Sequence, residues 1–389
     1  MKVALVSPYD YGRPGGVGEH VRHLAQELRS RGLQVSVLAP AASRGGAASA
    51  QGVIPLGRPI PVPANGSVAR ISLSFHLARR IRQILASERF DVVHLHEPLM
   101  PALPVTVLRL NDRGANVGTF HAYARQNLGY YYGRPLLKRL FRRLDASIAV
   151  SEPARSFVSR YFPSEYTVIP NGVDSATFSP QVPPALAPAP RQRTILFLGR
   201  LEERKGLGTL LDAYQLLRQV RADCRLLVGG DGALRRGYER RVEEEAIPDV
   251  SFLGFVPEPE KAAHFTAADI YCAPNTGKES FGVILLEAMA CGRPVVATAI
   301  DGFRQVITEG RQGLLVPPGD EARLAAALGR LLDHPQLRRQ LGQRGREAAE
   351  GYAWPLVADR VLSVYERALR HRSLAEVSPL VQQAAAGLR

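Results

Sequence analysis

The 389-residue sequence has only three cysteines and no long uninterrupted run of apolar residues. The cysteines, Cys224, Cys272 and Cys291, are an odd number at unrelated spacings, which argues against a disulfide framework and against a zinc site. We interpret them as reduced core residues of a cytosolic protein. No apolar run approaches the roughly 18 residues of a membrane-spanning helix, and Met1 leads directly into a predicted strand, so we expect no signal peptide and only peripheral membrane contact.

The first glycine-rich loop does not fit the dinucleotide-binding pattern. A strand at Lys2–Ser7, a loop at 8–18, a helix at Glu19–Arg31 and a strand at Gln34–Ala39 form a βαβ unit, which predicts a doubly wound parallel sheet. The loop lacks G-x-G-x-x-G and the second strand does not end in an acidic residue, so a nicotinamide dehydrogenase is excluded. The glycines would let the backbone approach a ligand, although an ordinary βα turn would have a similar composition.

The sequence carries a large excess of positive charge and enough apolar residues for two cores. Its length predicts two domains of about 170–200 residues each, and 46% hydrophobic residues favour packed domains over disorder. Lysine and arginine number 50 against 36 acidic residues, a net charge of +14. This excess implies an acidic partner, which could be nucleic acid, anionic lipid or a phosphorylated substrate.

The most informative stretch is residues 278–298, KESFGVILLEAMACGRPVVAT. It follows a short buried strand, and its apolar residues recur at helical spacing up to Gly292, a typical helix C-cap. Glu279 therefore lies in the loop that enters the helix, and Glu287 lies inside the helix. The start of a helix suits a diphosphate, whereas a carboxylate deeper in the helix can bind ribose hydroxyls. From the residues alone, two solvated glutamates explain the pair about equally well.

A second basic stretch, FLGRLEERKG at residues 197–206, follows another predicted strand. Arg200 and Lys205 flank the turn, and two cations at a βα turn suit a diphosphate through charge-assisted hydrogen bonds. An isolated pair of this kind is more often simply solvated.

Residues 278–298 resemble family 4 of the retaining glycosyltransferases with GT-B architecture, where Glu279 and Glu287 would form the E-x7-E pattern, and residues 197–206 resemble the pyrophosphate motif of that family. A proline usual before the second arginine of that motif is absent, so we expect the loop to differ at Arg204. The resemblance implies an α/β fold of two facing Rossmann-like domains with parallel sheets. It implies these donor-binding residues: Gly16, Arg200, Lys205, Glu279, Ser280, Phe281, Gly282, Val283 and Glu287.

Motifs in the N-terminal half, PYDYGRPGGVGEHV, NGSVAR, VVHLHEP and GTFHA, resemble the phosphatidylinositol mannosyltransferases of family 4. We expect Ser67 to cap a helix that runs to Ala86, with Arg70 in its first turn, where a bound anion would explain a cation. His94, His96 and His121 come from two strands and could suggest a metal, but their apolar neighbours favour hydrogen-bonding roles. The resemblance implies these acceptor-binding residues: Tyr9, Asn65, Ser67, Arg70, His121 and Arg204.

Residues 130–144, YYYGRPLLKRLFRRL, predict a basic amphipathic helix. One half of the helical wheel is basic, with Arg134, Lys138, Arg139, Arg142 and Arg143. The other half is apolar, with Leu136, Leu137, Leu140, Phe141 and Leu144. Such a helix suits an anionic lipid surface, although a helix packed on its own core with a solvated basic face is common. The resemblance favours the membrane, which would place the protein on the cytoplasmic face of the cell membrane.

The resemblance implies a mechanism in which mannose passes from GDP-mannose to the inositol of phosphatidylinositol or a related lipid. The catalytic residues would be Glu279, His121, Arg200 and Lys205, with the two cations stabilising the departing diphosphate. The sequence has no Asp-x-Asp, and these cations could replace a metal, so we expect no obligatory metal or other cofactor. No second carboxylate is placed as a nucleophile, and a same-face substitution is implied instead.

Three other functions stay open at this point. A family member could use a UDP-sugar with another lipid or a polysaccharide acceptor, or the protein could be a UDP-sugar epimerase or bind nucleic acid. NGSVAR and the amphipathic helix argue against the epimerase, and no recognised nucleic-acid-binding motif occurs. The expected partners are therefore a nucleotide sugar and an anionic phospholipid, and not nucleic acid.

The proline-rich stretch near residues 180–190 predicts a stiff linker. We expect an N-terminal domain at 1–174, the linker at 175–192 and a C-terminal domain at 193–352. The resemblance implies that a last helix at 353–372 returns to the first domain. The segment 373–389 is weakly patterned and stays unassigned.

Overall fold

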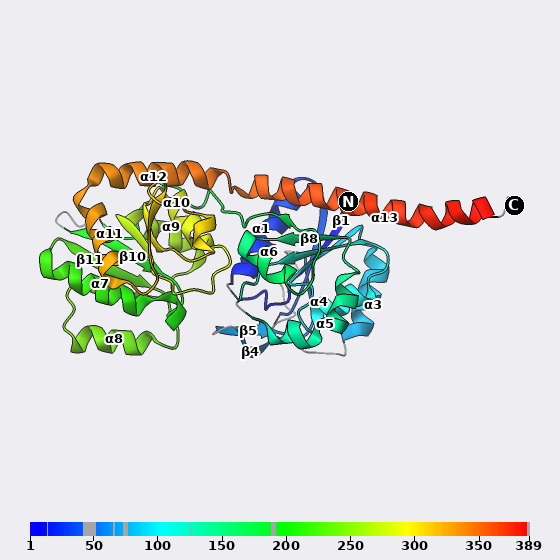
Figure 1. Cartoon of the computed structure of the whole chain (residues 1–389), viewed down its shortest axis with the longest axis horizontal. Helices are drawn as coiled ribbons and strands as arrows, with labels where there is room; N and C mark the ends of the chain where they lie inside the picture. The colour runs from blue at the N-terminus through cyan, green and yellow to red at the C-terminus, as the bar shows by residue number, and fades with distance from the viewer. Residues whose placement is uncertain are drawn as a thin grey trace. The chain divides into compact units, whose positions relative to one another are not determined.

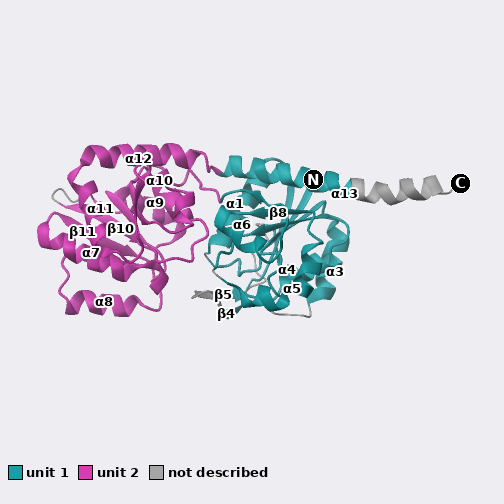
Figure 2. Cartoon of the chain, viewed as in Figure 1, with its two compact units in different colours: residues 1–170, 354–389 teal, residues 171–353 magenta. Residues whose placement is uncertain are grey.

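The computed structural model contains two compact α/β units (Figures 1 and 2). It describes residues 1–13, 15–41, 52–64, 67–72, 77–124, 126–187 and 192–386. Unit 1 comprises Met1–Pro170 and Trp354–Arg389, and unit 2 comprises Asn171–Ala353. The predicted α/β class with parallel sheets is confirmed, and the three cysteines are free and buried in unit 2.

Unit 1 is built on a seven-stranded parallel sheet with the order β3-β2-β1-β6-β7-β8-β9. Its central strands are nearly all apolar because both faces of the sheet are covered. The strands are β1 (Lys2–Val6), β2 (Gln34–Ala39), β3 (Val53–Pro55), β6 (Val92–His96), β7 (Ala115–Phe120), β8 (Ala146–Ala149) and β9 (Thr167–Val168).

The helices of unit 1 that the structure describes can be followed in Figure 1. They are α1 (Gly16–Ser30), α3 (Leu77–Glu88), α4 (Leu103–Leu110), α5 (Leu128–Phe141), α6 (Glu152–Ser159) and α13 (Trp354–Ala386). Helix α1 buries Val21, Leu24 and Leu28 against β1 and β2, as its helical apolar spacing predicts. Helix α13 contributes to the same core with Trp354, Val357, Ala358, Val361, Val364, Tyr365 and Ala368.

The predicted helix from Ser67 to Ala86 is wrong over its first part. Residues Ile60–Ala64 (β4) and Ser67–Ile71 (β5) instead pair as two antiparallel strands, and the helix in this region, α3, begins only at Leu77. Ser67 is therefore not a helix N-cap, and Arg70 lies in a strand rather than in a first helical turn. The paired strands satisfy each other's backbone hydrogen bonds, which removes the need for a cap.

Unit 2 repeats the parallel design with a six-stranded sheet of order β12-β11-β10-β13-β14-β15. The strands are β10 (Arg193–Leu198), β11 (Cys224–Gly229), β12 (Val250–Gly254), β13 (Ile270–Ala273), β14 (Val295–Thr298) and β15 (Gly313–Val316). The α-helices are α7 (Leu207–Val220), α8 (Arg235–Glu244), α9 (Glu258–Ala267), α10 (Val283–Ala290), α11 (Glu321–Asp333) and α12 (Pro335–Glu350). Its loops also contain the short 3₁₀ segments η1 (Glu203–Lys205) and η2 (Phe303–Gln305).

Each sheet has one point where the strand order reverses direction. In unit 1 this point lies between β1 and β6, and in unit 2 it lies between β10 and β13. Ligands of doubly wound folds bind beside such a point, at the carboxyl ends of the strands. The loops that begin at Ser7, Glu97, Gly199 and Pro274 therefore mark the ligand-binding edges of the two units.

The unit boundaries differ from the predicted linker at 175–192. Phe178 is buried in the core of unit 2, and Val182 and Leu186 pack against that core. The amide of Ala185 also donates to the carbonyl of Ala263. The prolines stiffen this segment, but its apolar residues hold the described part of it, up to residue 187, on unit 2. In the part of the chain that the structure describes, no helix is long and apolar enough to cross a membrane.

Candidate active site

The carboxylate of Glu279 accepts three hydrogen bonds at the carboxyl edge of the unit 2 sheet. Its Oε1 lies 2.5 Å from Lys205 Nζ, 2.6 Å from an Arg204 guanidinium nitrogen and 2.9 Å from the Asn275 amide nitrogen. Lys205 and Arg204 come from η1, after β10, and Asn275 and Glu279 come from the loop after β13. The point where the strand order reverses thus brings together two segments that are about 75 residues apart in the chain.

Close backbone packing fixes this arrangement. Gly206 has a φ of +72°, and a Cβ there would lie 2.0 Å from the carbonyl oxygen of Pro274, so no side chain fits between the two loops. A Cβ on Gly302 would lie 2.3 Å from the carbonyl oxygen of Glu279. Lys278, directly before Glu279, is a non-glycine residue with a φ of +60°, a conformation that occurs mainly where the surrounding structure imposes it.

The charges of the cluster depend on one another. Burial alone would raise the pKa of Glu279, but Lys205 and Arg204 outweigh this effect and hold the pKa below its ordinary value. Burial lowers the pKa of Lys205, and the attraction of Glu279 opposes that change only in part. The carboxylate is therefore ionised at neutral pH, and it partly neutralises two largely buried cations at a place where an anionic ligand would compete for them.

Arg200 and Arg204, the two arginines of residues 197–206, have different surroundings. Arg200 is about half exposed, with 56% of its side-chain surface accessible, and it pairs with Glu202 at 3.1 Å. Glu202 also pairs with Arg204 at 3.0 Å. Arg204 was predicted to bind the acceptor, but the structure places it in the Glu279 cluster. Its position next to Lys205 on one 3₁₀ turn explains this placement.

Glu287 is buried in α10 and forms an ion pair with Lys261 of α9 at 3.3 Å. It is therefore not a solvated helix charge, which was the alternative interpretation of the E-x7-E pair. Lys261 also contacts Glu258, and these two carboxylates raise its pKa although burial would lower it. The sequence did not single out Lys261, because a lysine near the start of a surface-patterned helix carries no distinctive signal.

The remaining predicted donor residues surround the start of α10. Gly282 precedes the helix with a φ of +103°, and a Cβ there would lie 2.7 Å from the ring of Phe303. Phe281 is buried in the core, whereas Ser280 and Val283 are partly exposed. In unit 1, Gly16 is the first residue of α1, and a Cβ there would meet no atom within 4 Å. The start of α1 is therefore open.

Two predicted acceptor residues meet at the carboxyl edge of the unit 1 sheet. Tyr9 follows β1 and forms a backbone bridge with Ile71 of β5. The amide of Asp10 donates to the carbonyl of Arg70, 2.9 Å away. The antiparallel strands β4 and β5 thus bring Arg70 to the loop that carries Tyr9. Asn65 lies outside the described residues, and of Ser67 only the backbone is described.

Four histidines form a buried cluster next to this edge. His94 and His96 lie on β6, His121 follows β7, and His20 lies on α1. Ring centroids are 4.5 Å apart for His94 and His96, and 4.9 Å apart for His20 and His121. The sequence predicted the first three to lie among apolar neighbours, but they contact one another and His20. His20 was missed because its position on the helix after the glycine loop has no strand pattern.

The geometry of the cluster favours hydrogen bonds between the rings. His96 Nδ1 lies 2.9 Å from His121 Nε2. Ligating atoms of His20, His96 and His121 lie within 4.8 Å of one another, a spacing that could hold a metal ion. The hydrogen bond already uses one nitrogen of His96 and one of His121, and we therefore interpret the cluster as a hydrogen-bonding group.

Glu97, directly after β6, holds the backbone at His121. Its Oε1 accepts hydrogen bonds from the amides of His121 and Ala122, both at 2.7 Å. The residue is buried and has a φ of +51°, which is unusual for a side chain of this size. Burial raises the pKa of its carboxyl group to about 7, although the two amides act in the opposite direction. Glu97 also raises the pKa of Tyr9, after the larger effect of burial.

The surface of α5 combines positive charge with exposed apolar side chains. All five predicted basic residues, Arg134, Lys138, Arg139, Arg142 and Arg143, are exposed. Of the predicted apolar half, Leu137, Leu140, Phe141 and Leu144 pack into the core of unit 1. Leu136 instead stands in solvent with 68% of its surface accessible, and Leu128, Tyr131 and Tyr132 are exposed to a similar degree. We call Leu128, Tyr131, Tyr132 and Leu136 the α5 apolar patch.

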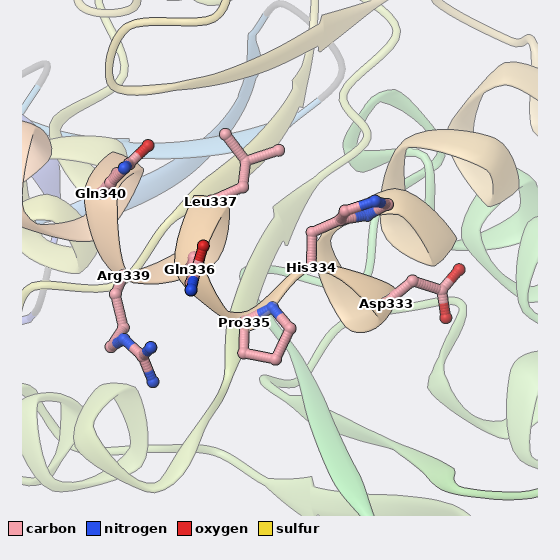
Figure 3. A pocket seen from close by; sticks show the side chains of 7 residues that line it. All are labelled: Asp333, His334, Pro335, Gln336, Leu337, Arg339 and Gln340. Atoms are coloured by element: carbon pink, nitrogen blue, oxygen red, sulfur yellow. The ribbon is translucent and has the colours of Figure 1, made fainter.

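A surface hollow of about 620 Å³ lies at the junction of α11 and α12 (Figure 3). It is lined by Asp333, His334, Pro335, Gln336, Leu337, Arg339 and Gln340. Asp333 pairs with Arg221, which lies three residues before the start of β11, and so marks the amino-terminal edge of the sheet. The hollow therefore lies at the edge opposite Glu279 and is not part of the candidate active site.

Comparison with known proteins agrees with these features. Residues 180–348 match the model of "Glycosyl transferases group 1", and residues 14–177 match that of "Glycosyltransferase Family 4". The chain is 41% identical to the phosphatidyl-myo-inositol mannosyltransferase of Mycobacterium leprae, over 97% of this chain and 100% of that protein. For the Mycobacterium tuberculosis enzyme of the same name, the identity is 40% over 94% and 97%. A sucrose-phosphate synthase from Thermosynechococcus elongatus has a similar fold, with a TM-score of 0.74, 24% identity, and 94% and 98% coverage.

The chain has two α/β units, each with a parallel sheet, and a largely buried carboxylate–cation cluster at the point where the strand order of unit 2 reverses. Together with the family match, these features define a glycosyltransferase of the GT-B class. Within that class, the chain belongs to the family of the phosphatidyl-myo-inositol mannosyltransferases. The family predicted from residues 278–298 and from the N-terminal motifs is thus confirmed.

Proposed function

We propose that this glycosyltransferase transfers mannose, with retention, from GDP-mannose to the inositol of phosphatidylinositol or a closely related lipid. The identity of 40–41% to phosphatidyl-myo-inositol mannosyltransferases, over nearly the full length of the chain, supports mannose as the sugar and phosphatidylinositol as the acceptor. The observation that carries the site assignment is the triple hydrogen bond to Glu279, which joins the two cations to the carboxylate at the ligand-binding edge of unit 2.

The donor would bind by an exchange of ionic partners. The diphosphate of the nucleotide sugar takes over Lys205 and Arg204, and Glu279 is released to bind hydroxyls of the hexose. As the bond between sugar and phosphate breaks, negative charge grows on the diphosphate, and the two cations stabilise it. The leaving phosphate accepts the proton of the inositol hydroxyl, so the new bond forms on the same face of the sugar. Arg200 supplies further positive charge, and Glu287 binds the ribose.

The acceptor would bind at the carboxyl edge of the unit 1 sheet. Tyr9, Arg70 and Ser67 would receive the inositol phosphate, and His121 would donate a hydrogen bond to the transferred hexose. The α5 apolar patch and the neighbouring arginines support attachment to an anionic bilayer, because apolar side chains enter the interface while cations attract the lipid headgroups. The protein would then act as a peripheral enzyme on the cytoplasmic face of the cell membrane.

The transfer would need no divalent metal, since Lys205, Arg204 and Arg200 already supply positive charge at the diphosphate. Activity that persists in EDTA is the expected result. Loss of activity in EDTA and recovery with magnesium would contradict this part of the proposal.

The direct test is transfer of radiolabelled mannose from GDP-mannose to phosphatidylinositol vesicles, with UDP-glucose as the competing donor and soluble inositol phosphate as the competing acceptor. We expect labelled lipid from GDP-mannose only. Glu279→Gln should abolish most of the transfer. Glu203→Gln is the matched control that should keep it, because Glu203 is an exposed glutamate on η1, directly before Arg204. Labelling from the UDP-sugar, or of the soluble acceptor alone, would assign the same site to a different reaction.

A further inference from the structure

The hydrogen bond between His96 and His121 raises the question of which ring donates the proton. Both rings are buried, and burial lowers the pKa of each well below its ordinary value, so both are neutral at physiological pH. A neutral imidazole has one N–H donor and one unprotonated acceptor nitrogen. The bond between His96 Nδ1 and His121 Nε2 therefore allows two arrangements, which differ in where the second proton of the pair lies.

The surroundings of His96 distinguish the two arrangements. His96 Nε2 is buried and has no hydrogen-bond partner among the residues that the structure describes. If His121 donated, His96 would carry its proton on this Nε2, which would be a buried N–H without an acceptor. An unpaired nitrogen remains in the other arrangement too, but there it is only an acceptor, and in protein backbones orphaned buried N–H groups are rarer than under-satisfied acceptors. The favoured arrangement therefore has the proton on His96 Nδ1.

The proton on His121 follows from this choice. Its Nε2 accepts from His96, so its own proton lies on Nδ1. Nδ1 of His121 has no partner in the described part of the chain and is the nitrogen left for a ligand. The backbone at His121 is held in place, because the carboxylate of Glu97 accepts hydrogen bonds from the amides of His121 and Ala122.

We propose that His96 is a positioning residue that fixes His121 in the Nδ1–H tautomer, so that His121 presents a hydrogen-bond donor to a hydroxyl oxygen of the transferred hexose and not a proton acceptor. This role rests on the proposed function only as far as the ligand is concerned. The tautomer itself is a property of the protein without a ligand. With Nε2 already occupied, His121 does not act as the base that removes a proton from the acceptor, in agreement with a mechanism in which the leaving phosphate takes that proton.

The tautomer can be measured in the full-length protein by NMR with histidine-selective ¹⁵N labelling. Protonated and unprotonated ring nitrogens differ widely in ¹⁵N shift, and His121→Gln identifies the resonances of His121. We expect a protonated Nδ1 and an unprotonated Nε2 for His121. A protonated Nε2 would overturn the proposal, whatever the outcome of the transferase assay.

Three variants then test whether His96 is the cause. His96→Asn places an amide nitrogen as many bonds from Cα as Nδ1, so it can still donate, and His121 should keep its tautomer. His96→Leu has no donor, and His121 should change to the Nε2–H form. His94→Leu is the matched control: it removes a buried imidazole from the same face of β6, which bonds Thr119 and Tyr365 instead. It should leave the tautomer of His121 unchanged. An unchanged tautomer in His96→Leu would contradict the proposed role.

The kinetic consequence separates positioning from general stability. His96→Leu should lower kcat for mannose transfer about tenfold, the equivalent of one hydrogen bond to the sugar, and should change the KM for GDP-mannose much less. His96→Asn should stay within about threefold of the wild type. If His96→Asn loses as much activity as His96→Leu while its His121 keeps the Nδ1–H form, the tautomer does not control the reaction. If no variant or wild type transfers mannose, the proposed function fails and the NMR result still decides the tautomer.

Discussion

Replacing Glu279 by glutamine should destabilise the empty enzyme and strengthen its binding of GDP. The glutamine keeps the size of the side chain and one carbonyl oxygen, but it removes the charge that neutralises Lys205 and Arg204. Hydrogen bonds to charged groups contribute about 1.5–3 kcal/mol each, and the amide oxygen retains part of this. About 16% of the side-chain surface of each cation is exposed, so water compensates for some of the loss. We therefore expect a loss of about 2 kcal/mol in the free energy of unfolding.

This loss should appear as a lower melting temperature of unit 2. For a domain of 150–250 residues, 1 kcal/mol changes Tm by about 2–4 °C, which gives a decrease of about 4–8 °C. GDP should reverse the defect, because its diphosphate supplies the missing negative charge. In the wild type, GDP must first separate the cations from Glu279. In the variant this cost is absent, so GDP should bind roughly fivefold more tightly, a gain of about 1 kcal/mol.

Thermal unfolding with and without saturating GDP, together with calorimetric titration of GDP, measures both effects. The difference in Tm between wild type and Glu279→Gln should shrink when GDP is present. Glu203→Gln should behave like the wild type in every measurement. Equal melting temperatures, or weaker GDP binding by Glu279→Gln, would refute the exchange of ionic partners.

Three further outcomes follow from the structure. Glu97→Gln keeps an oxygen for both amides and removes a carboxyl group whose pKa is raised to about 7. The free energy of unfolding of the wild type should therefore fall as the pH rises from about 4.5 to 7, whereas that of the variant should not. In urea unfolding at pH 8, the variant should be more stable than the wild type by up to about 3 kcal/mol. Gly302→Ala forces a Cβ against the backbone of Glu279, and calorimetry should show a loss of GDP affinity along with about 1–3 kcal/mol of stability. Changing both Arg139 and Arg142 to glutamine should weaken binding to anionic vesicles about 30-fold in flotation assays; the same double change at Arg323 and Arg330 of α11 should have no effect, and equal losses for the two pairs would contradict a specific membrane surface.

Most of the fold could be predicted because its signals are local. Buried parallel strands appear as short apolar runs, and helices such as α7 have an apolar residue at nearly every third or fourth position. Strands β1 and β2 lie within one residue of their predicted positions. The pairing of strands far apart in the sequence has no such signal, and the family resemblance supplied it.

The error at Ser67 has a clear physical origin. Pro61 and Pro63 are unusual residues for a strand, and Ser67 is a typical helix N-cap residue. The dipeptide Asn65-Gly66, however, stands between the two paired strands in the sequence and is a strong hairpin signal. A hairpin turn at this dipeptide places Arg70 in the second strand.

The chemistry of the site could be predicted only in part. The sequence identified Glu279 and Lys205, but it could not show that they bind each other in the empty enzyme, because this contact depends on the loop packing at Gly206 and Gly302. The partnership of His20 with the strand histidines was hidden for the same reason. It arises where a helix crosses the edge of a sheet.

The return of α13 to unit 1 determines the order in which a nascent chain can complete its two units. Residues 171–353 form unit 2 without a break and can fold as soon as they leave the ribosome. In the first 170 residues, α1 covers one part of this sheet face, but the part over β7 and β8 stays uncovered until Trp354 and the following apolar residues emerge. The hydroxyl of Tyr365 can then form its hydrogen bond with His94 Nδ1, 2.7 Å away. The histidine cluster, encoded mostly in the first third of the chain, is therefore among the last parts of the enzyme to be completed. A nascent chain that ends before residue 354 would have apolar sheet surface exposed to solvent and would be a substrate for chaperones and proteases.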